Sequence, residues 1–202
     1  MQIIDISRDI TKCELYPGDP EVRLEVASAL SRGDSCNLSA IYTGLHNGTH
    51  ADAPLHFIEG GESIDKADLS VFIGECYVIE VPEGPITGEY VDNHFPRDAE
   101  RVLIKGNGKA WFMENGAEEV AFSKIKLIGT DSLSVGTHGN QTGPHRALLR
   151  ENVAIVENLD LSKVKPGKYF LLAQPLKIGS AEAAPLRAVL LADFIFWSGS
   201  KA

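Results

Sequence analysis

The chain has 202 residues, of which 44% are hydrophobic and 23% are charged, proportions typical of a soluble globular protein. Its formal net charge of −9 argues against nucleic acid or an anionic membrane surface as the main partner. No basic stretch precedes an apolar run at the N-terminus, and no run reaches the roughly 18 apolar residues of a membrane span. We therefore expect a cytoplasmic protein.

Short runs of β-branched and aliphatic residues recur along the chain and predict a strand-rich fold. Alternation in Arg23–Val26 and Tyr77–Val81 predicts strands with one solvated face, whereas Phe170–Ala173 and Ala188–Ala192 are continuously apolar and predict strands buried on both faces. In chain order the predicted strands are Gln2–Ser7, Val22–Ala27, Cys76–Val81, Arg101–Ile104, Lys126–Thr130, Val153–Val156, Lys168–Gln174 and Arg187–Phe196.

Two helices are predicted. One begins at Pro144, because proline is tolerated in a first helical turn, and it continues through Leu149. The other, Ala117–Lys124, has two acids in its first turn and a lysine at its end, the order that the helix dipole favours. No repeat or linker divides the sequence, so we predict a single mixed α/β, β-rich domain over residues 1–202 with few helices.

Two long, glycine-rich connections, Leu45–Gly61 and Ser132–Gly143, are candidates for function, and the second is a candidate pocket lid. Lys105–Lys109 lacks the spacing of a phosphate-binding loop and predicts a plain turn. A serine triad is not expected, since no nucleophile elbow surrounds its only candidates. Those candidates are Asp131, Ser132, Ser134 and His138.

The segment 46–56 reads HNGTHADAPLH and concentrates half of the six histidines. Its candidate ligands are His46, His50, Asp52 and His56. The Asn-Gly-Thr run and Pro54 exclude a helix, and a fully extended segment would spread the outer histidines over roughly 33 Å. Ligands of one metal lie about 2 Å from it, so a metal site requires the segment to curl. Imidazole and carboxylate suit Zn²⁺, and also Mn²⁺ or Fe²⁺; the alternative is a polar surface loop.

At this motif the sequence resembles the cyclase family of metal-dependent hydrolases, which includes kynurenine formamidases and isatin hydrolases. The family signature H-x-G-T-H-x-D-x-P-x-H matches at every fixed position of 46–56. The likeness extends from Tyr16–Pro20 to Pro175–Ile178 and Pro185–Val189. It implies the family's swivelling β/β/α-type fold and a homodimer or larger homo-oligomer.

The resemblance also implies a full set of metal ligands, namely His46, His50, Asp52, His145 and Glu157. In dinuclear members the aspartate is shared between two metals. From the residues alone, Glu157 follows a buried-looking strand, where an acid is costly unless it is paired or bound to a cation. We expect one or two divalent cations per subunit, with Zn²⁺ preferred and Mn²⁺ as the alternative.

Two imidazoles and a carboxylate leave positions open on a metal, as catalytic sites do, and such a metal activates water near neutral pH. The resemblance then predicts hydrolysis of a small-molecule amide at its C–N bond, first of all an N-formyl aryl amine. His56 is implied to be the acid/base group and not a ligand, titrating near its ordinary pKa of about 6.5. The alternatives are a cyclic amide such as isatin, a lactone, or a non-catalytic metal-stabilised binding protein.

Tyr16 is the one departure from the family pattern. Kynurenine formamidases typically have tryptophan before Pro-Gly-Asp, where it helps to hold the aromatic substrate. Tyrosine retains an aromatic face and adds a hydroxyl that needs a hydrogen-bond partner. We predict that Tyr16 binds substrate, with a packing role as the alternative.

The cysteines Cys13, Cys36 and Cys76 are odd in number and widely spaced. This pattern is typical of free thiols in a reducing compartment rather than of a disulfide framework. We expect all three to be buried residues with a structural role.

Overall fold

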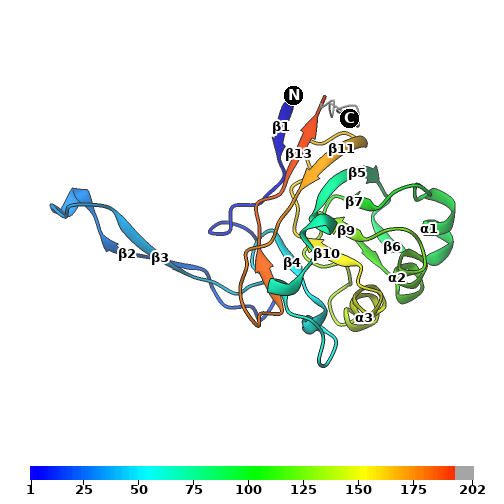
Figure 1. The fold of residues 1–202 in the computed structure, drawn as a ribbon, viewed down its shortest axis with the longest axis horizontal. Coiled ribbons are helices and arrows are strands. Elements are labelled where there is room, and N and C mark those ends of the chain that lie inside the picture. Colours follow the sequence, from blue (N-terminus) through cyan, green and yellow to red (C-terminus); the bar gives the residue numbers. More distant parts are fainter. Residues whose placement is uncertain (194–202) are drawn as a thin grey trace, which may run out of the picture.

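A nine-stranded sheet forms the centre of the computed structural model, which describes residues 1–193. The strands follow one another across the sheet in the order β1-β13-β11-β5-β7-β9-β10-β4-β12 (Figure 1). The four strands from β5 to β10 are parallel, and the strands on either side join antiparallel. Their bounds are β1 Gln2–Asp5, β4 His50–Asp52, β5 Ile73–Glu80, β7 Arg101–Lys105, β9 Leu127–Thr130, β10 Ala154–Glu157, β11 Gly167–Leu172, β12 Ala183–Pro185 and β13 Val189–Ala192. The mixed α/β, strand-rich prediction is confirmed.

Three helices lie together on one side of this sheet: α1 (Gly88–His94), α2 (Glu114–Ala121) and α3 (Thr142–Arg150). Helix α3 confirms the element predicted at Pro144. Helix α2 begins before the predicted Ala117 and ends before Lys124, because the chain turns at Ser123, whose Oγ accepts from Ile125 N–H. Helix α1 was missed, although Thr87 caps it by accepting from Tyr90 N–H. The short strands β6 (Gly84–Ile86) and β8 (Ala110–Phe112) pair parallel beside these helices.

The central parallel strands are buried on both faces, which explains their continuous apolar sequences. In β7, Val102 and Ile104 pack in the cluster that contains the helices. Leu103, between them, points into a second cluster on the other side of the sheet. The central strands therefore form a rigid platform, and β4 lies beside it, paired with β10.

The strands β11 and β13 are more open than predicted. Leu171 and Leu190 are buried, but the neighbours of each are only half-buried, so the prediction of burial on both faces is wrong here. The described helices cover the other part of the sheet, which leaves this face partly solvated. Strand β13 ends at Ala192, and residues 194–196 of the predicted strand lie outside the described residues. The prediction of one solvated face for Tyr77–Val81 is wrong, because Val78 is buried in one cluster and Val81 in the other, where half-buried Tyr77 and Ile79 also pack.

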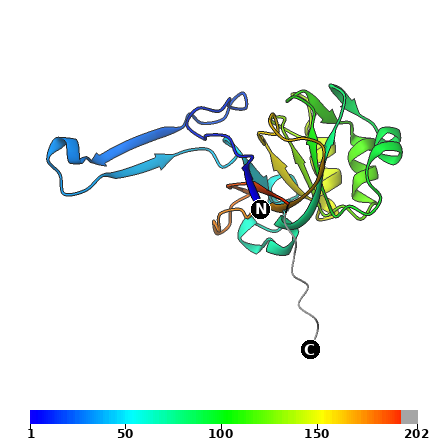
Figure 2. The same ribbon diagram turned by 90° about the horizontal axis from the view of Figure 1, so that it is seen from above.

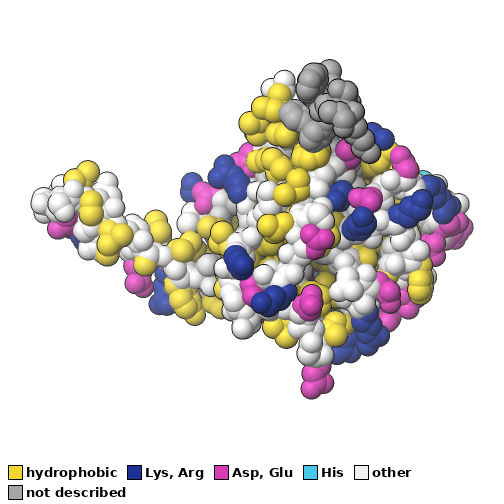
Figure 3. Space-filling model, in the orientation of Figure 1, with side chains coloured by type: hydrophobic (Ala, Val, Ile, Leu, Met, Phe, Trp, Pro, Cys, Tyr) yellow, Lys and Arg dark blue, Asp and Glu magenta, His cyan; other side chains and the backbone are white. Residues whose placement is uncertain are grey.

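A two-stranded arm projects from the body (Figures 1 and 2). Strands β2 (Arg23–Ser28) and β3 (Leu38–Tyr42) pair antiparallel, and neither contains a buried residue. The prediction that Arg23–Val26 has one covered face is therefore wrong, because no layer packs on either side. Large hydrophobic side chains follow the arm (Figure 3). Leu24, Val26, Leu30, Leu38, Ile41 and Tyr42 are each at least 50% exposed.

All three cysteines are free, as predicted. Cys76 is buried in the sheet, but Cys13 is only half-buried and Cys36 is exposed in the arm, so the expectation of burial is wrong for these two. Within residues 1–193, none of the helices is long and apolar enough to cross a membrane.

Candidate metal centre

Strand β4 brings the histidine motif against β10. The antiparallel register places His50 opposite Glu157 and Asp52 opposite Ile155. Because alternate residues of a strand face the same side, His50 and Asp52 project together toward Glu157. Helix α3 adds His145 from its first turn. Three elements far apart in sequence thus converge on one buried point.

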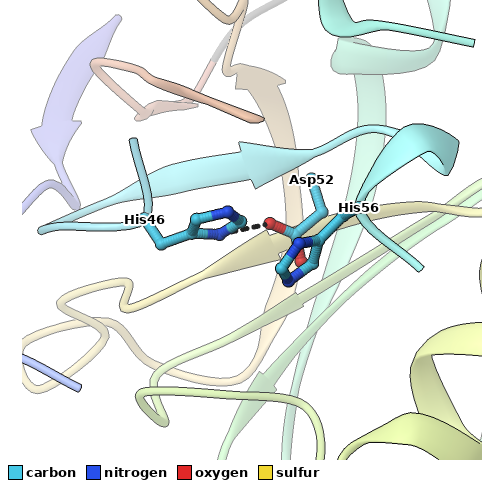
Figure 4. A group of neighbouring side chains, drawn as sticks. All are labelled: His46, Asp52 and His56. Carbon is cyan, nitrogen blue, oxygen red and sulfur yellow. Dashed lines mark ion pairs between the residues drawn. The ribbon is translucent and has the colours of Figure 1, made fainter. Parts of the chain in front are cut away.

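The motif curls as a metal site requires. Gly48 has a φ of +69°, and a Cβ there would lie 3.3 Å from Ile10, so this turn favours glycine. Beyond β4, Pro54 begins a 3-10 turn that ends at His56. The rings of His46 and His56 consequently lie 4.1 Å apart between centroids, with Asp52 beside them (Figure 4).

The polar atoms of the cluster lie within a few ångströms of one another. Asp52 Oδ1 is 3.1 Å from His46 Nδ1 and 3.4 Å from His50 Nε2. Asp52 Oδ2 is 3.5 Å from His145 Nε2. Glu157 lies 3.5 Å from His50 Nε2 through Oε2 and 3.2 Å from His145 Nε2 through Oε1. Asp52 is therefore central to the cluster.

Two imidazoles are oriented by main-chain carbonyls. His50 Nδ1 donates to Gly48 O at 2.9 Å, and His145 Nδ1 donates to Gln141 O at 2.8 Å. With Nδ1 carrying the hydrogen, Nε2 of each ring faces the carboxylates. Metal-binding histidines are oriented in this way, with the second nitrogen donating to a carbonyl.

The cluster fits a divalent cation because its buried polar atoms lack partners. His50 Nε2 and both carboxylate oxygens of Asp52 are buried without a hydrogen bond in the described structure. Such groups are costly unless a charge or a metal compensates them. Two groups of three have ligand atoms within 4.8 Å of one another, and they share Asp52. They are His46, Asp52 and His56, and His50, Asp52 and Glu157.

The charges in the cluster favour protonated imidazoles at His50 and His145 and an ionised carboxylate at Asp52. Burial lowers the pKa of His50 and of His145, but the carboxylates of Asp52 and Glu157 beside them outweigh it and raise each pKa to about 10. Burial raises the pKa of Asp52, yet the surrounding histidines bring it well below its usual range. A cation that binds here must therefore displace protons from imidazoles.

His56 differs from the other histidines of the cluster. Burial lowers its pKa to about 4, although the charge of Asp52 opposes the change. The expectation of an ordinary pKa for His56 is therefore wrong, because the ring is packed between His46 and Phe57. His56 is neutral near pH 7, and its ring is close enough to Asp52 to be counted among the groups that could bind a metal.

Sequence reasoning missed two contributors to the site. Glu182, which precedes β12, lies 3.5 Å from His46 Nε2. The backbone N–H of Val135 donates to Glu157 Oε1 at 2.7 Å and fixes that carboxylate. A main-chain donor has no sequence signal, and Glu182 becomes visible only through the pairing of β12 with β4.

Tyr16 finds the partner that its hydroxyl needs. Its oxygen lies 3.0 Å from Nδ1 of His138, on the glycine-rich connection after β9.

The predicted turn at Lys105–Lys109 is confirmed by φ values of +56° at Asn107 and +71° at Gly108. Ser132 Oγ donates to Ala110 O and thus takes no part in a triad.

Comparisons with known proteins agree on one family. The family model described as "Putative cyclase" matches residues 4–137. The kynurenine formamidase of Delftia acidovorans is 36% identical over 190 residues, which cover 88% of this chain and 91% of that protein. The kynurenine formamidase of Salinibacter ruber is 34% identical over 94% of this chain and 97% of its own length.

Solved structures share the fold. A predicted metal-dependent hydrolase from Bacillus stearothermophilus superposes with a TM-score of 0.81 at 26% identity, covering 94% of this chain and 97% of its own. Isatin hydrolase A from Labrenzia aggregata has a TM-score of 0.79 at 21% identity, with coverage of 94% and 93%. The second likeness is one of fold alone.

Proposed function

Because the chain belongs to the cyclase family, we propose that it is a metal-dependent hydrolase that cleaves the amide C–N bond of an N-formyl aryl amine. The observation that carries the proposal is the set of buried, unpartnered atoms at His50 and Asp52. A solvated surface loop or a satisfied polar core would not leave such atoms without partners. The formamidase relatives supply the substrate class.

The proposed ligands are His46, His50, Asp52, His145 and Glu157, arranged as one or two cation positions that share the aspartate. Zn²⁺ is the proposed metal and Mn²⁺ the alternative, since imidazole and carboxylate suit both. When bound, a divalent cation supplies Lewis acidity, which activates water and polarises an acyl oxygen.

His56 is the proposed acid/base group. Its neutral ring can accept a proton from the attacking water and then donate it to the nitrogen of the leaving amine. Its place beside Asp52 and His46, at the end of the turn that begins at Pro54, holds it at the cluster. Phe57 stacks on His145 and shields this side from solvent.

The test separates metal binding from proton transfer. His56→Ala should retain its metal, measured by elemental analysis, and lose most of its turnover of formanilide. Asp52→Ala should lose the metal and the activity together, whereas His94→Ala, an exposed histidine on α1, should keep both. If His56→Ala is emptied of metal, the division of roles is wrong. Turnover of isatin and of a lactone, measured beside formanilide, shows whether the protein hydrolyses N-formyl aryl amines or one of the alternative substrate classes.

We also propose a cytoplasmic location for the protein. We further propose that it forms a homodimer, or a larger homo-oligomer, through the arm. An isolated two-stranded ribbon is only marginally stable in water, and the apolar side chains on this arm need a cover. A second copy is present at equal concentration, and a two-fold axis lets each arm pack on the other body. Val26→Asp should shift the mass measured by light scattering toward the monomer. An unchanged mass would refute the role of the arm.

A further inference from the structure

The imidazole of His46 lies between two carboxylates, and each of its nitrogens faces one of them. Nδ1 is 3.1 Å from Asp52 Oδ1, the ion pair drawn in Figure 4. Nε2 is 3.5 Å from Glu182 Oε1. The side chain of Asp52 is fully buried, whereas Glu182 is half-buried. His46 therefore joins the buried cluster to a carboxylate at its edge.

His46 turns a different nitrogen toward the cluster than the other two imidazoles do. In His50 and His145, Nδ1 donates to a main-chain carbonyl and Nε2 faces the carboxylates. In His46, Nδ1 faces Asp52 and Nε2 faces Glu182, and no main-chain carbonyl in the described part of the chain accepts from the ring. Glu182 is therefore the group that can orient His46 as a carbonyl orients each of the other two rings.

The contact between His46 and Asp52 fits two ligands of one cation better than a hydrogen bond. Asp52 Oδ1 is buried and has no hydrogen-bond partner in the described structure, although Nδ1 of His46 is only 3.1 Å away. Two atoms that each lie about 2 Å from one metal, at a tetrahedral angle, are roughly 3.3 Å apart. A cation here takes the Nδ1 lone pair of a neutral imidazole, which then carries its hydrogen on Nε2. That hydrogen faces Glu182.

The main chain on both sides of Glu182 is held against the histidine motif. The carbonyl of Glu182 accepts from Ala53 N–H at 2.8 Å, and the carbonyl of Ala181 accepts from Ile64 N–H at 2.9 Å. The next residue begins β12, which pairs with β4. The sheet edge that holds the motif thus also places the Glu182 carboxylate beside His46.

We propose that Glu182 is a positioning residue of the proposed metal centre, whose carboxylate accepts the Nε2 hydrogen of His46 and leaves Nδ1 to bind the cation. Metal-binding histidines commonly donate their second N–H to a carboxylate, which orients the ring and raises its basicity. The opposite tautomer would set the Nε2 lone pair against a carboxylate, and two acceptors form no hydrogen bond. From 3.5 Å, the Glu182 oxygen needs to approach by only a few tenths of an ångström. The inference rests on the proposed function, which supplies His46 as a ligand.

The first test reads the tautomer of His46 in the wild-type protein. Long-range ¹H–¹⁵N spectra of the zinc-loaded protein, labelled at histidine, distinguish a hydrogen on Nδ1 from one on Nε2 after each ring is assigned through bonds from its Cβ. We expect His46 to carry its hydrogen on Nε2 and His50 to carry it on Nδ1. A hydrogen on Nδ1 of His46 would overturn the positioning role. This result does not depend on whether any variant folds.

The second test measures Zn²⁺ affinity by competition with a chromophoric chelator. Glu182→Leu should weaken binding by about tenfold or more, the worth of a residue that supports a metal ligand. Glu182→Gln should retain part of the affinity, because its amide oxygen can still accept from His46. Glu59→Leu removes the same charge from an exposed position on the loop after His56 and should leave the affinity unchanged.

A double variant shows whether Glu182 acts through the ring. In a His46→Ala background, Glu182→Leu should cause no further loss of Zn²⁺ affinity, because the group that it orients is absent. An unchanged affinity in Glu182→Leu alone, an equal loss in Glu59→Leu, or the full loss repeated in the His46→Ala background would overturn the proposal.

Turnover of formanilide is measured in the same wild-type protein. Turnover together with a hydrogen on Nδ1 of His46 refutes the positioning role and leaves the proposed function intact. The expected tautomer and affinities without turnover of any N-formyl aryl amine refute the proposed function and leave the positioning role intact.

Discussion

Replacement of one buried histidine, His145, should remove most of the stabilisation that a divalent metal gives to the protein. His145 is 1% exposed, and its Nε2 lies within 3.5 Å of both Asp52 and Glu157. At a free Zn²⁺ concentration of about 100 times Kd, binding to the native state alone stabilises it by about 2.7 kcal/mol. With an unfolding entropy of roughly 0.4 kcal/mol/K for a chain of this length, the wild-type Tm should rise by about 6 °C.

His145→Asn should lose most of this shift. Loss of a ligand weakens binding by about 100-fold or more, given that supporting residues alone are worth 10–100-fold. At the same Zn²⁺ concentration the gain falls to about 0.4 kcal/mol, or about 1 °C. Each variant is compared with its own EDTA-treated sample by scanning calorimetry, so that the direct cost of the substitution cancels. His94→Asn, also on a helix but exposed, is the control; a full shift in His145→Asn would refute the ligand assignment.

Two further predictions concern packing and thiol chemistry. Gly116→Ala should lower the free energy of unfolding by about 1–3 kcal/mol in a denaturant titration, because its Cβ would lie 2.2 Å from Ile86 O. Gly179→Ala, where a Cβ meets nothing within 4 Å, should not lower it; equal losses would show that contact with Ile86 is not the cause. Iodoacetamide at pH 8 should label Cys36 and spare Cys76 until the protein unfolds, because burial raises the pKa of Cys76 to about 12. Labelling of native Cys76 at the rate of Cys36, followed by mass spectrometry, would contradict its burial.

Local patterns predicted the parts of the fold whose environment the sequence itself determines. The central strands are apolar on both faces, so composition alone identifies them, and Gly48 with Pro54 indicates that the histidine segment curls. The arm was misjudged because Arg23–Val26 alternates like a half-buried strand. Alternation predicts two different faces, but it does not reveal whether any layer covers one of them.

Contacts between distant segments were beyond the reach of such patterns. The hydrogen bond between Tyr16 and His138 has no local sequence signal, because the two residues lie 122 positions apart and the bond depends on two loops meeting. The lowered pKa of His56 likewise follows from burial in the folded cluster, where its ring lies beside those of His46 and His145. Burial, which lowers the pKa of His56, is a property of the assembled fold and not of the local sequence.

The candidate metal centre depends on the register of a strand only three residues long. His50 and Asp52 face the cluster, while Ala51 between them is fully buried in the apolar core on the other side. A slip of one residue would exchange these faces and bury two polar side chains in that core. Pairing with β10 on one side and β12 on the other holds β4 in register along its whole length. The packing that stabilises the sheet therefore also fixes His50 opposite Glu157, and the site needs no flexible loop to bring its central groups together.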